Sequence, residues 1–260
     1  MFAANQIPFQ KLSSREVKFI KSLRLKKHRQ QENVFIVEGA KNVTQLLASS
    51  YTVPILVGTP NFLAAHPALW SKHDGAILQT DETTLASLGN LTTNKAVLAV
   101  ARIPTHASEA PPEEAWGLVI DDIRDPGNLG AIVRIADWYN IPTIVCSPTT
   151  VDLYNPKVLQ ASMGSFLRVQ VHYTPLPAFL RSTSKPVLGT FTTGNNLHQT
   201  QPPCPAWIVI GNEAQGISPT VQSYIQQRIT IPRYGKAESL NAAIATAIVC
   251  DHWQRQQSRG

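Results

Sequence analysis

The second half of the chain alternates short apolar segments with segments of helical periodicity. Strands that are apolar at nearly every residue are typical of a parallel sheet covered by helices on both faces. The alternation therefore predicts an α/β fold for this part of the chain. We expect strands at residues 116–120, 142–146, 168–171, 187–191, 207–210 and 228–231, and helices at residues 130–139, 156–163 and 239–253.

The first part of the chain carries a second, smaller α/β pattern. Residues 104–115 contain prolines and small polar residues without periodicity, which is typical of a linker. We therefore expect an N-terminal domain at residues 1–103 and a second domain at residues 116–260. Within the N-terminal domain the pattern predicts a basic helix at Ser13–Leu25 that the serines can cap, strands at residues 34–37, 53–57 and 96–100, and a helix at residues 41–48.

Composition indicates a folded protein with an affinity for polyanions. Hydrophobic residues make up 43% and charged residues 15% of the chain, and the net charge is +6. The three cysteines, Cys146, Cys204 and Cys250, show no C-x-x-C spacing, which fits the reducing cytoplasm. No signal-peptide pattern, bilayer-length apolar run or metal-binding histidine motif is present. We therefore expect a cytoplasmic protein with neither a membrane nor a metal as partner.

Three glycine-containing segments beside predicted strands and helices carry polar residues that could bind a ligand or take part in catalysis. They are Asp125–Arg134, Ile210–Gly216 and Ile231–Asn241. Glycine lets the backbone approach a ligand closely, and ligands of open α/β sheets sit at the carboxyl ends of the strands. The dinucleotide pattern G-x-G-x-x-G and the P-loop pattern are absent, which argues against an ordinary nucleotide-binding domain.

Each segment also has a purely structural interpretation. Asn128 can cap the helix that follows it, and Glu213 can be a solvated loop acid. Ser239 can cap the last helix, with Asn241 in its first turn. Arg134 is harder to explain in this way, because its neighbours are apolar and a guanidinium in such a context favours a specific anion.

At these segments the chain resembles the SpoU (TrmH) family of SPOUT RNA 2′-O-ribose methyltransferases. The resemblance extends to Asp152–Lys157 and Ser162–Phe166 and is looser in the N-terminal part. It implies a C-terminal SPOUT domain with a parallel sheet and a deep trefoil knot, preceded by a smaller α/β substrate-binding domain. It also implies S-adenosyl-L-methionine as cofactor and a homodimer formed through the C-terminal domain.

The resemblance assigns roles to individual residues. The backbone at Gly211, Ile231 and Leu240 would bind the cofactor. Arg233 departs from the family pattern, which often has methionine there, and it could alter the pocket rim or contact a phosphate. The catalytic residues would be Asn128, Arg134, Glu213, Ser239 and Asn241.

A basic cluster near the N-terminus is the candidate RNA-binding surface, although a charge run can also be a solvated helix face. Ribosomal RNA is favoured as the substrate over transfer RNA, because a further domain precedes the motifs. One alternative is a non-catalytic RNA-binding factor, and the complete set of motifs argues against it. The other is a base methyltransferase, and the segment Ser239-Leu240-Asn241 argues against that. The cluster comprises Lys18, Lys21, Arg24, Lys26, Lys27 and Arg29.

Overall fold

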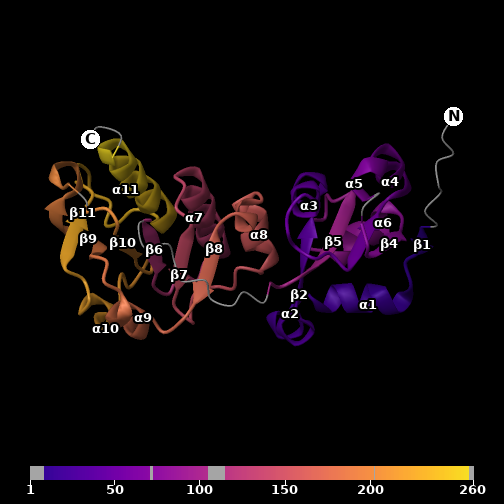
Figure 1. The fold of residues 1–260 in the computed structure, drawn as a ribbon, viewed down its shortest axis with the longest axis horizontal. Helices are drawn as coiled ribbons and strands as arrows, with labels where there is room; N and C mark the ends of the chain where they lie inside the picture. Colours follow the sequence, from indigo (N-terminus) through magenta and orange to yellow (C-terminus); the bar gives the residue numbers. More distant parts are fainter. Residues whose placement is uncertain (1–8, 71–72, 105–114, 202, 258–260) are drawn as a thin grey trace. The chain divides into compact units, whose positions relative to one another are not determined.

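The computed structural model describes residues 9–70, 73–104, 115–201 and 203–257. The chain forms two compact units, Met1–Thr105 and His106–Gly260. Nearly all of the predicted linker, residues 104–115, lies outside the described residues. Figure 1 shows the helices and strands of each unit along the chain.

The first unit is built on a mixed sheet with the strand order β1-β4-β3-β5-β2 among the described residues. β5 runs antiparallel to β2 and β3, whereas β4 runs parallel to β1 and β3. The strands are β1 Gln10–Lys11, β2 Val34–Glu38, β3 Ile55–Gly58, β4 Ala76–Gln79 and β5 Val97–Arg102. The helices are α1 Ser14–Ser22, α2 Lys26–Glu32, α3 Ala40–Leu47, α4 Pro60–Ala65, α5 Pro67–Trp70 and α6 Glu82–Leu88.

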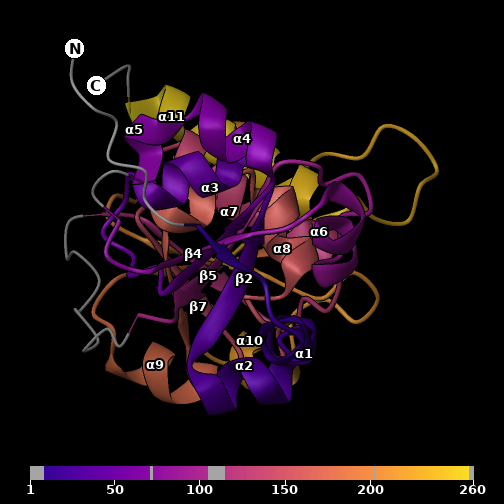
Figure 2. The ribbon, with the colours of Figure 1, turned by 90° about the vertical axis from the view of Figure 1, so that its right-hand side faces the viewer.

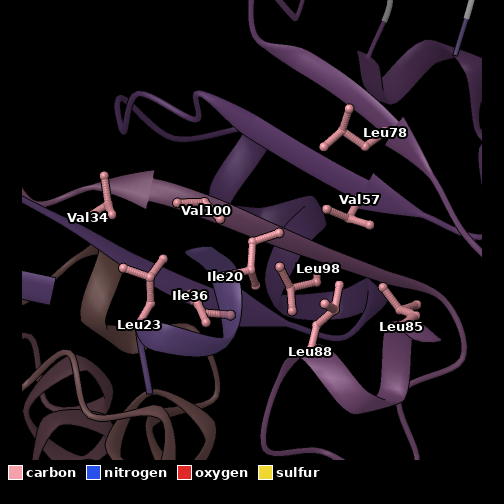
Figure 3. Packing of buried hydrophobic residues seen from close by; sticks show 10 residues of the cluster. All are labelled: Ile20, Leu23, Val34, Ile36, Val57, Leu78, Leu85, Leu88, Leu98 and Val100. Atoms are coloured by element: carbon pink, nitrogen blue, oxygen red, sulfur yellow. The ribbon is translucent and has the colours of Figure 1, made fainter. Parts of the chain in front are cut away.

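The basic helix predicted at Ser13–Leu25 is α1, and a second helix, α2, follows it directly. Ser13 caps α1, as expected, through a capping box with Glu16. The first helix ends at Ser22, and Leu25, in an extended conformation, is the N-cap of α2. Ile20 and Leu23 bury their side chains in a cluster with residues of the sheet and with Leu85 and Leu88 of α6, and Leu23 lies beside Val34 and Ile36 (Figure 3). Burial of this apolar face stabilises α1, so its lysines lie on the side away from the core.

The second unit contains a sheet with the order β11-β9-β10-β6-β7-β8, in which every pair is parallel. This confirms the parallel α/β fold expected from the apolar strands. The strands are β6 Gly117–Ile120, β7 Thr143–Cys146, β8 Gln170–Tyr173, β9 Val187–Asn196, β10 Trp207–Ile210 and β11 Gln227–Thr230. The α-helices are α7 Pro126–Trp138, α8 Pro156–Ser162, α9 Leu176–Ser182, α10 Pro219–Gln222 and α11 Ala242–Gln257, and short 3₁₀ turns lie at Ser165–Leu167 and Leu197–Gln199.

Helices cover both faces of this parallel sheet. α7, α8 and α11 lie on one face, and α9 and α10 lie on the other (Figures 1 and 2). Gly130 permits the close approach of α7 to α8, because a Cβ there would meet the Ala161 Cβ at 2.5 Å. One role of the first motif is therefore helix packing, which sets where the N-terminus of α7 lies.

Candidate active site

The N-terminus of α7 is capped by Asp125. Its carboxylate accepts a hydrogen bond of 2.8 Å from the Asn128 backbone N–H, and Pro126 occupies the first helical position. The structural interpretation of Asn128 as the cap is therefore wrong. Asn128 lies in the first turn of the helix, so its side chain can make tertiary contacts.

The side chain of Asn128 links two other predicted site residues. Its Nδ2 donates to Glu213 Oε1 at 2.5 Å, and its Oδ1 accepts from Asn241 Nδ2 at 2.8 Å. We call these three residues the amide–carboxylate network. It joins the first, second and third sequence motifs at one place.

Asn241 also caps the last helix. Its Oδ1 accepts from the backbone N–H groups of Ala243 at 3.0 Å and Ile244 at 3.3 Å, and α11 begins directly after it. The expectation that Ser239 caps this helix is wrong, because the helix starts later than its periodicity indicated. Ser239 lies in the exposed loop between β11 and α11.

The second motif forms a tight turn after β10. Asn212 and Gly216 exchange two backbone hydrogen bonds of 3.0 and 2.9 Å, and Gly216 has a φ of +68°, which favours glycine. A Cβ on Gly211 would collide with the backbone of Gly216, so this position requires glycine as well. The turn places Glu213 on its exposed outer side.

A cavity of about 980 Å³ lies at the carboxyl ends of β9, β10 and β11. Its volume suits a small organic cofactor, and its walls combine apolar side chains with a few polar groups. Asn128, Arg134 and Asn241 are not among its lining residues. Five of the predicted site residues do line it: Gly211, Glu213, Ile231, Ser239 and Leu240.

One wall of this cavity, three threonines and Phe191 in the stretch Thr190–Thr193, was not predicted from the sequence. β9 pairs with β11 at Gly189 and again at Asn195, while β11 advances by a single residue from Arg228 to Ile229. The intervening residues of β9 therefore bulge out of the ladder and face the cavity. The run of threonines just after the apolar start of the strand was the available signal.

Arg134 lies on the exposed face of α7. Its apolar neighbours Ile132, Val133 and Ala136 point into the core instead, so the apolar context inferred for its guanidinium is wrong. No hydrogen bond or ion pair involves Arg134 within the part of the chain that the structure describes. The structure thus leaves Arg134 on the surface of α7, outside the amide–carboxylate network, and its catalytic role stays a prediction.

Two arginines of the basic cluster stabilise the fold of the first unit. Arg29 is only 2% exposed, and its Nη1 donates to the carbonyl groups of Leu23 at 3.0 Å and Arg24 at 2.9 Å. The prediction that Arg29 contacts RNA is therefore wrong, because its guanidinium fastens the turn between α1 and α2.

Arg24 is bound in a similar way at the end of α6. Its guanidinium donates to the carbonyl groups of Ser87, Leu88 and Gly89, which satisfies backbone acceptors that the end of α6 leaves open. Arg24 is nevertheless exposed, so its contact with RNA stays a prediction. The remaining members of the cluster, Lys18, Lys21, Lys26 and Lys27, are all exposed.

Two of the three cysteines, Cys146 and Cys250, are buried. Burial raises the pKa of Cys250 to about 12 and also raises the pKa of Cys146, so both thiols stay protonated. No cluster of His, Cys, Asp or Glu suited to a metal ion occurs among the residues that the structure describes. No helix within the described ranges combines the length and hydropathy that crossing a bilayer requires.

The geometry defines an α/β domain with a cofactor-sized cavity at the carboxyl ends of a parallel sheet. One amide binds the carboxylate of Glu213 in the cavity wall, and a second amide binds the first. Residues 116–251 match the SpoU rRNA Methylase family, and residues 14–99 match the MRM3-like substrate binding domain. The chain therefore belongs to the SpoU rRNA methylase family.

Individual relatives agree over nearly the whole chain. The 23S rRNA (guanosine(2553)-2′-O)-methyltransferase RlmP of Bacillus subtilis is 30% identical over 92% of this chain and 96% of that protein. A solved structure of a putative RNA methyltransferase of the TrmH family from Porphyromonas gingivalis is 38% identical and has a TM-score of 0.85, covering 94% of this chain and 99% of that one. An AdoMet-bound rRNA methyltransferase from Sinorhizobium meliloti is 26% identical with the same TM-score, covering 95% and 96%.

Proposed function

We propose that the protein transfers a methyl group from S-adenosylmethionine to a ribose 2′-hydroxyl of ribosomal RNA. The observation that carries this proposal is the amide–carboxylate network of Asn241, Asn128 and Glu213 beside a cavity of about 980 Å³. Membership of the SpoU rRNA methylase family and the similarity to RlmP over most of both chains support the same reaction.

The cavity residues fit S-adenosylmethionine as the cofactor. Ile231 and Leu240 offer apolar surface for an adenine ring, and the threonines of the β9 bulge offer hydroxyl groups for ribose or amino-acid atoms. The carboxylate of Glu213 complements a positive charge. When bound there, S-adenosylmethionine would supply an activated methyl group on a cationic sulfur.

The task of this chain's own residues is to orient the ribose oxygen and to stabilise charge. Asn128 and Asn241 hold Glu213 in one orientation, so that the site is ordered before RNA arrives. We place Arg134 on the phosphate next to the target ribose, where it would also stabilise the negative charge developing on the 2′ oxygen. An arginine side chain has hydrogen-bond donors and no acceptor, so the hydroxyl proton would leave to phosphate or to water.

The first unit would hold the ribosomal RNA. Residues 14–99 match the MRM3-like substrate binding domain, which supports this assignment. Lys18, Lys21, Lys26 and Lys27 are exposed lysines of α1 and α2 and would contact phosphates. RNA binding through these lysines would weaken as salt concentration rises.

Two further features complete the proposal: a trefoil knot in the second unit and a homodimer formed through it. Family membership supports the knot. Two large apolar side chains on neighbouring helices support the dimer, because Trp138 of α7 is 83% exposed and Ile244 of α11 is 54% exposed. Large exposed apolar patches mark protein interaction sites, and we propose that these two side chains belong to one.

We also place the protein in the cytoplasm. All three cysteines are unpaired in the structure, and two of them are buried. That pattern of use suits a reducing compartment.

A methyl-transfer assay tests the proposed function. Purified protein is incubated with labelled S-adenosylmethionine and ribosomal RNA from cells that lack the protein. We expect label on a ribose of large-subunit RNA and none in transfer RNA. Label on a base, or RNA binding without transfer, would contradict the proposal; the second result would favour a non-catalytic RNA-binding factor.

A further inference from the structure

The loop between β11 and α11, residues 231–241, is held at both ends and exposed in between. It begins at the end of a ladder strand, and it ends at Asn241, which is fixed to Asn128 and to the first turn of α11. Every residue from Arg233 to Leu240 is exposed. Figure 2 shows this segment in gold, extending away from the body of the second unit.

The tip of this loop carries an aromatic ring between two cations. Tyr234 is 93% exposed, and Arg233 and Lys236 beside it are exposed as well. Arg233 and Tyr234 also line the cavity that contains Gly211 and Glu213. The backbone of the tip is closed by a hydrogen bond from Arg233 Nη1 to the Ala237 carbonyl at 3.4 Å.

Burial of an aromatic ring that is almost fully exposed to water is energetically favourable. The position of Tyr234 at the rim of the cavity therefore favours contact with a binding partner. A phenol ring flanked by cations suits a nucleotide, because every base has a face that can stack and every nucleotide has a phosphate. A second copy of this chain would be a less suitable partner, since two adjacent cations on an exposed loop favour an anion.

We propose that Tyr234 is a stacking platform for a base at or next to the methylated nucleotide, with Arg233 and Lys236 on the adjacent phosphates. The inference rests on the proposed function, because it requires the RNA to bind at the rim of the cavity that holds the cofactor. Stacking fixes the base, and the attached ribose then has few orientations relative to Glu213 and Asn128. Tyr234 is thus a substrate-positioning residue that acts on the RNA and not on the cofactor.

The experiment compares Tyr234→Ala with Tyr234→Phe, which keeps the ring. We measure kcat/KM for ribosomal RNA, the Kd for a short fluorescent single-stranded RNA, the Kd for S-adenosylmethionine by calorimetry, and the mass in solution. Loss of the ring should lower kcat/KM and weaken RNA binding about tenfold, which corresponds to ~1.4 kcal/mol of stacking. Tyr234→Phe should stay close to the wild type in both.

Cofactor affinity and mass in solution should be unchanged in Tyr234→Ala. If RNA binding and kcat/KM of this variant equal those of the wild type, the stacking role is wrong. A changed mass in solution would show that Tyr234 contacts a second copy of the chain. A loss of cofactor affinity as large as the loss of RNA affinity would place Tyr234 in the cofactor pocket. Either result overturns the inference. Failure of the wild-type protein to transfer a methyl group would overturn the proposed function. The RNA affinities of the wild type and Tyr234→Ala would still test whether Tyr234 stacks on a base.

Discussion

Asn241 Nδ2 donates a hydrogen bond of 2.8 Å to Asn128 Oδ1, although 113 positions separate the two residues in the chain. The cap of α11 determines the direction of this bond. Because Asn241 Oδ1 accepts from Ala243 and Ile244, its Nδ2 must face Asn128. Asn128 must then accept through Oδ1 and donate through Nδ2 to Glu213, so the start of α11 sets the orientation of the carboxylate.

Asn241→Asp separates the two roles of Asn241. An aspartate still caps α11, but it has no donor for Asn128, so the network loses one oriented hydrogen bond. We expect kcat to fall about tenfold, equivalent to ~1.4 kcal/mol, with little change in the free energy of unfolding. Methyl-transfer kinetics and urea unfolding check this result.

The matched variant is Asn241→Ala, which loses both roles. Its free energy of unfolding should fall by about 1 kcal/mol through loss of the cap, in addition to the loss of kcat. If Asn241→Asp and wild type turned over equally, the orientation of Glu213 would not depend on the network.

Arg134→Ala should abolish most methyl transfer while cofactor binding persists. Arg134 is exposed on α7 and outside the cavity lining, so the cofactor pocket does not depend on its side chain. Removing a charge-stabilising donor typically lowers kcat by about a hundredfold or more. Single-turnover rates and calorimetry with S-adenosylmethionine measure the two effects separately, and near-normal turnover would exclude Arg134 from the mechanism.

Replacing Lys18, Lys21, Lys26 and Lys27 together by alanine should weaken RNA binding without unfolding the first unit. The slope of log affinity against log salt should drop by about 0.7 for each phosphate of single-stranded RNA that the protein no longer neutralises. Lys95→Ala is the control, because Lys95 is an exposed lysine of the same unit that pairs with Glu82. Equal effects from the control would indicate a general charge effect.

Arg29→Ala should behave differently from the lysine variants. It removes buried hydrogen bonds to two carbonyl groups, so we expect the free energy of unfolding to fall by about 2 kcal/mol. RNA affinity measured on the folded fraction should be unchanged. Retained stability together with weaker RNA binding would restore Arg29 to the RNA-binding surface.

The double variant Trp138→Asp, Ile244→Asp tests the proposed homodimer. Charged groups in place of exposed apolar side chains of an interface oppose association, so sedimentation velocity should show monomers where the wild type shows dimers. Trp138→Phe should remain dimeric. A dimeric double variant would place the interface elsewhere.

The sequence predicted the parallel sheet, because apolar strands are a local signal, whereas the assignment of the three motifs to one site came from the resemblance to the SpoU family. It did not predict which residue caps each helix. Asp125 and Asn128 both have side chains that could cap α7, and Ser239 and Asn241 both have side chains that could cap α11. The contacts of the folded chain determine which residue of each pair does so. The structural role of Arg29 was hidden for the same reason. A buried arginine and a solvated arginine look alike in a charge run, and burial is decided by packing.

The most direct test of the proposed methyl transfer is ribose-methylation mapping of ribosomal RNA from cells with and without the protein. We expect one 2′-O-methyl mark in large-subunit RNA to disappear without the protein. The wild-type gene should restore this mark, and Arg134→Ala should not. An unchanged set of ribose marks, or the loss of a base modification instead, would contradict the proposed reaction.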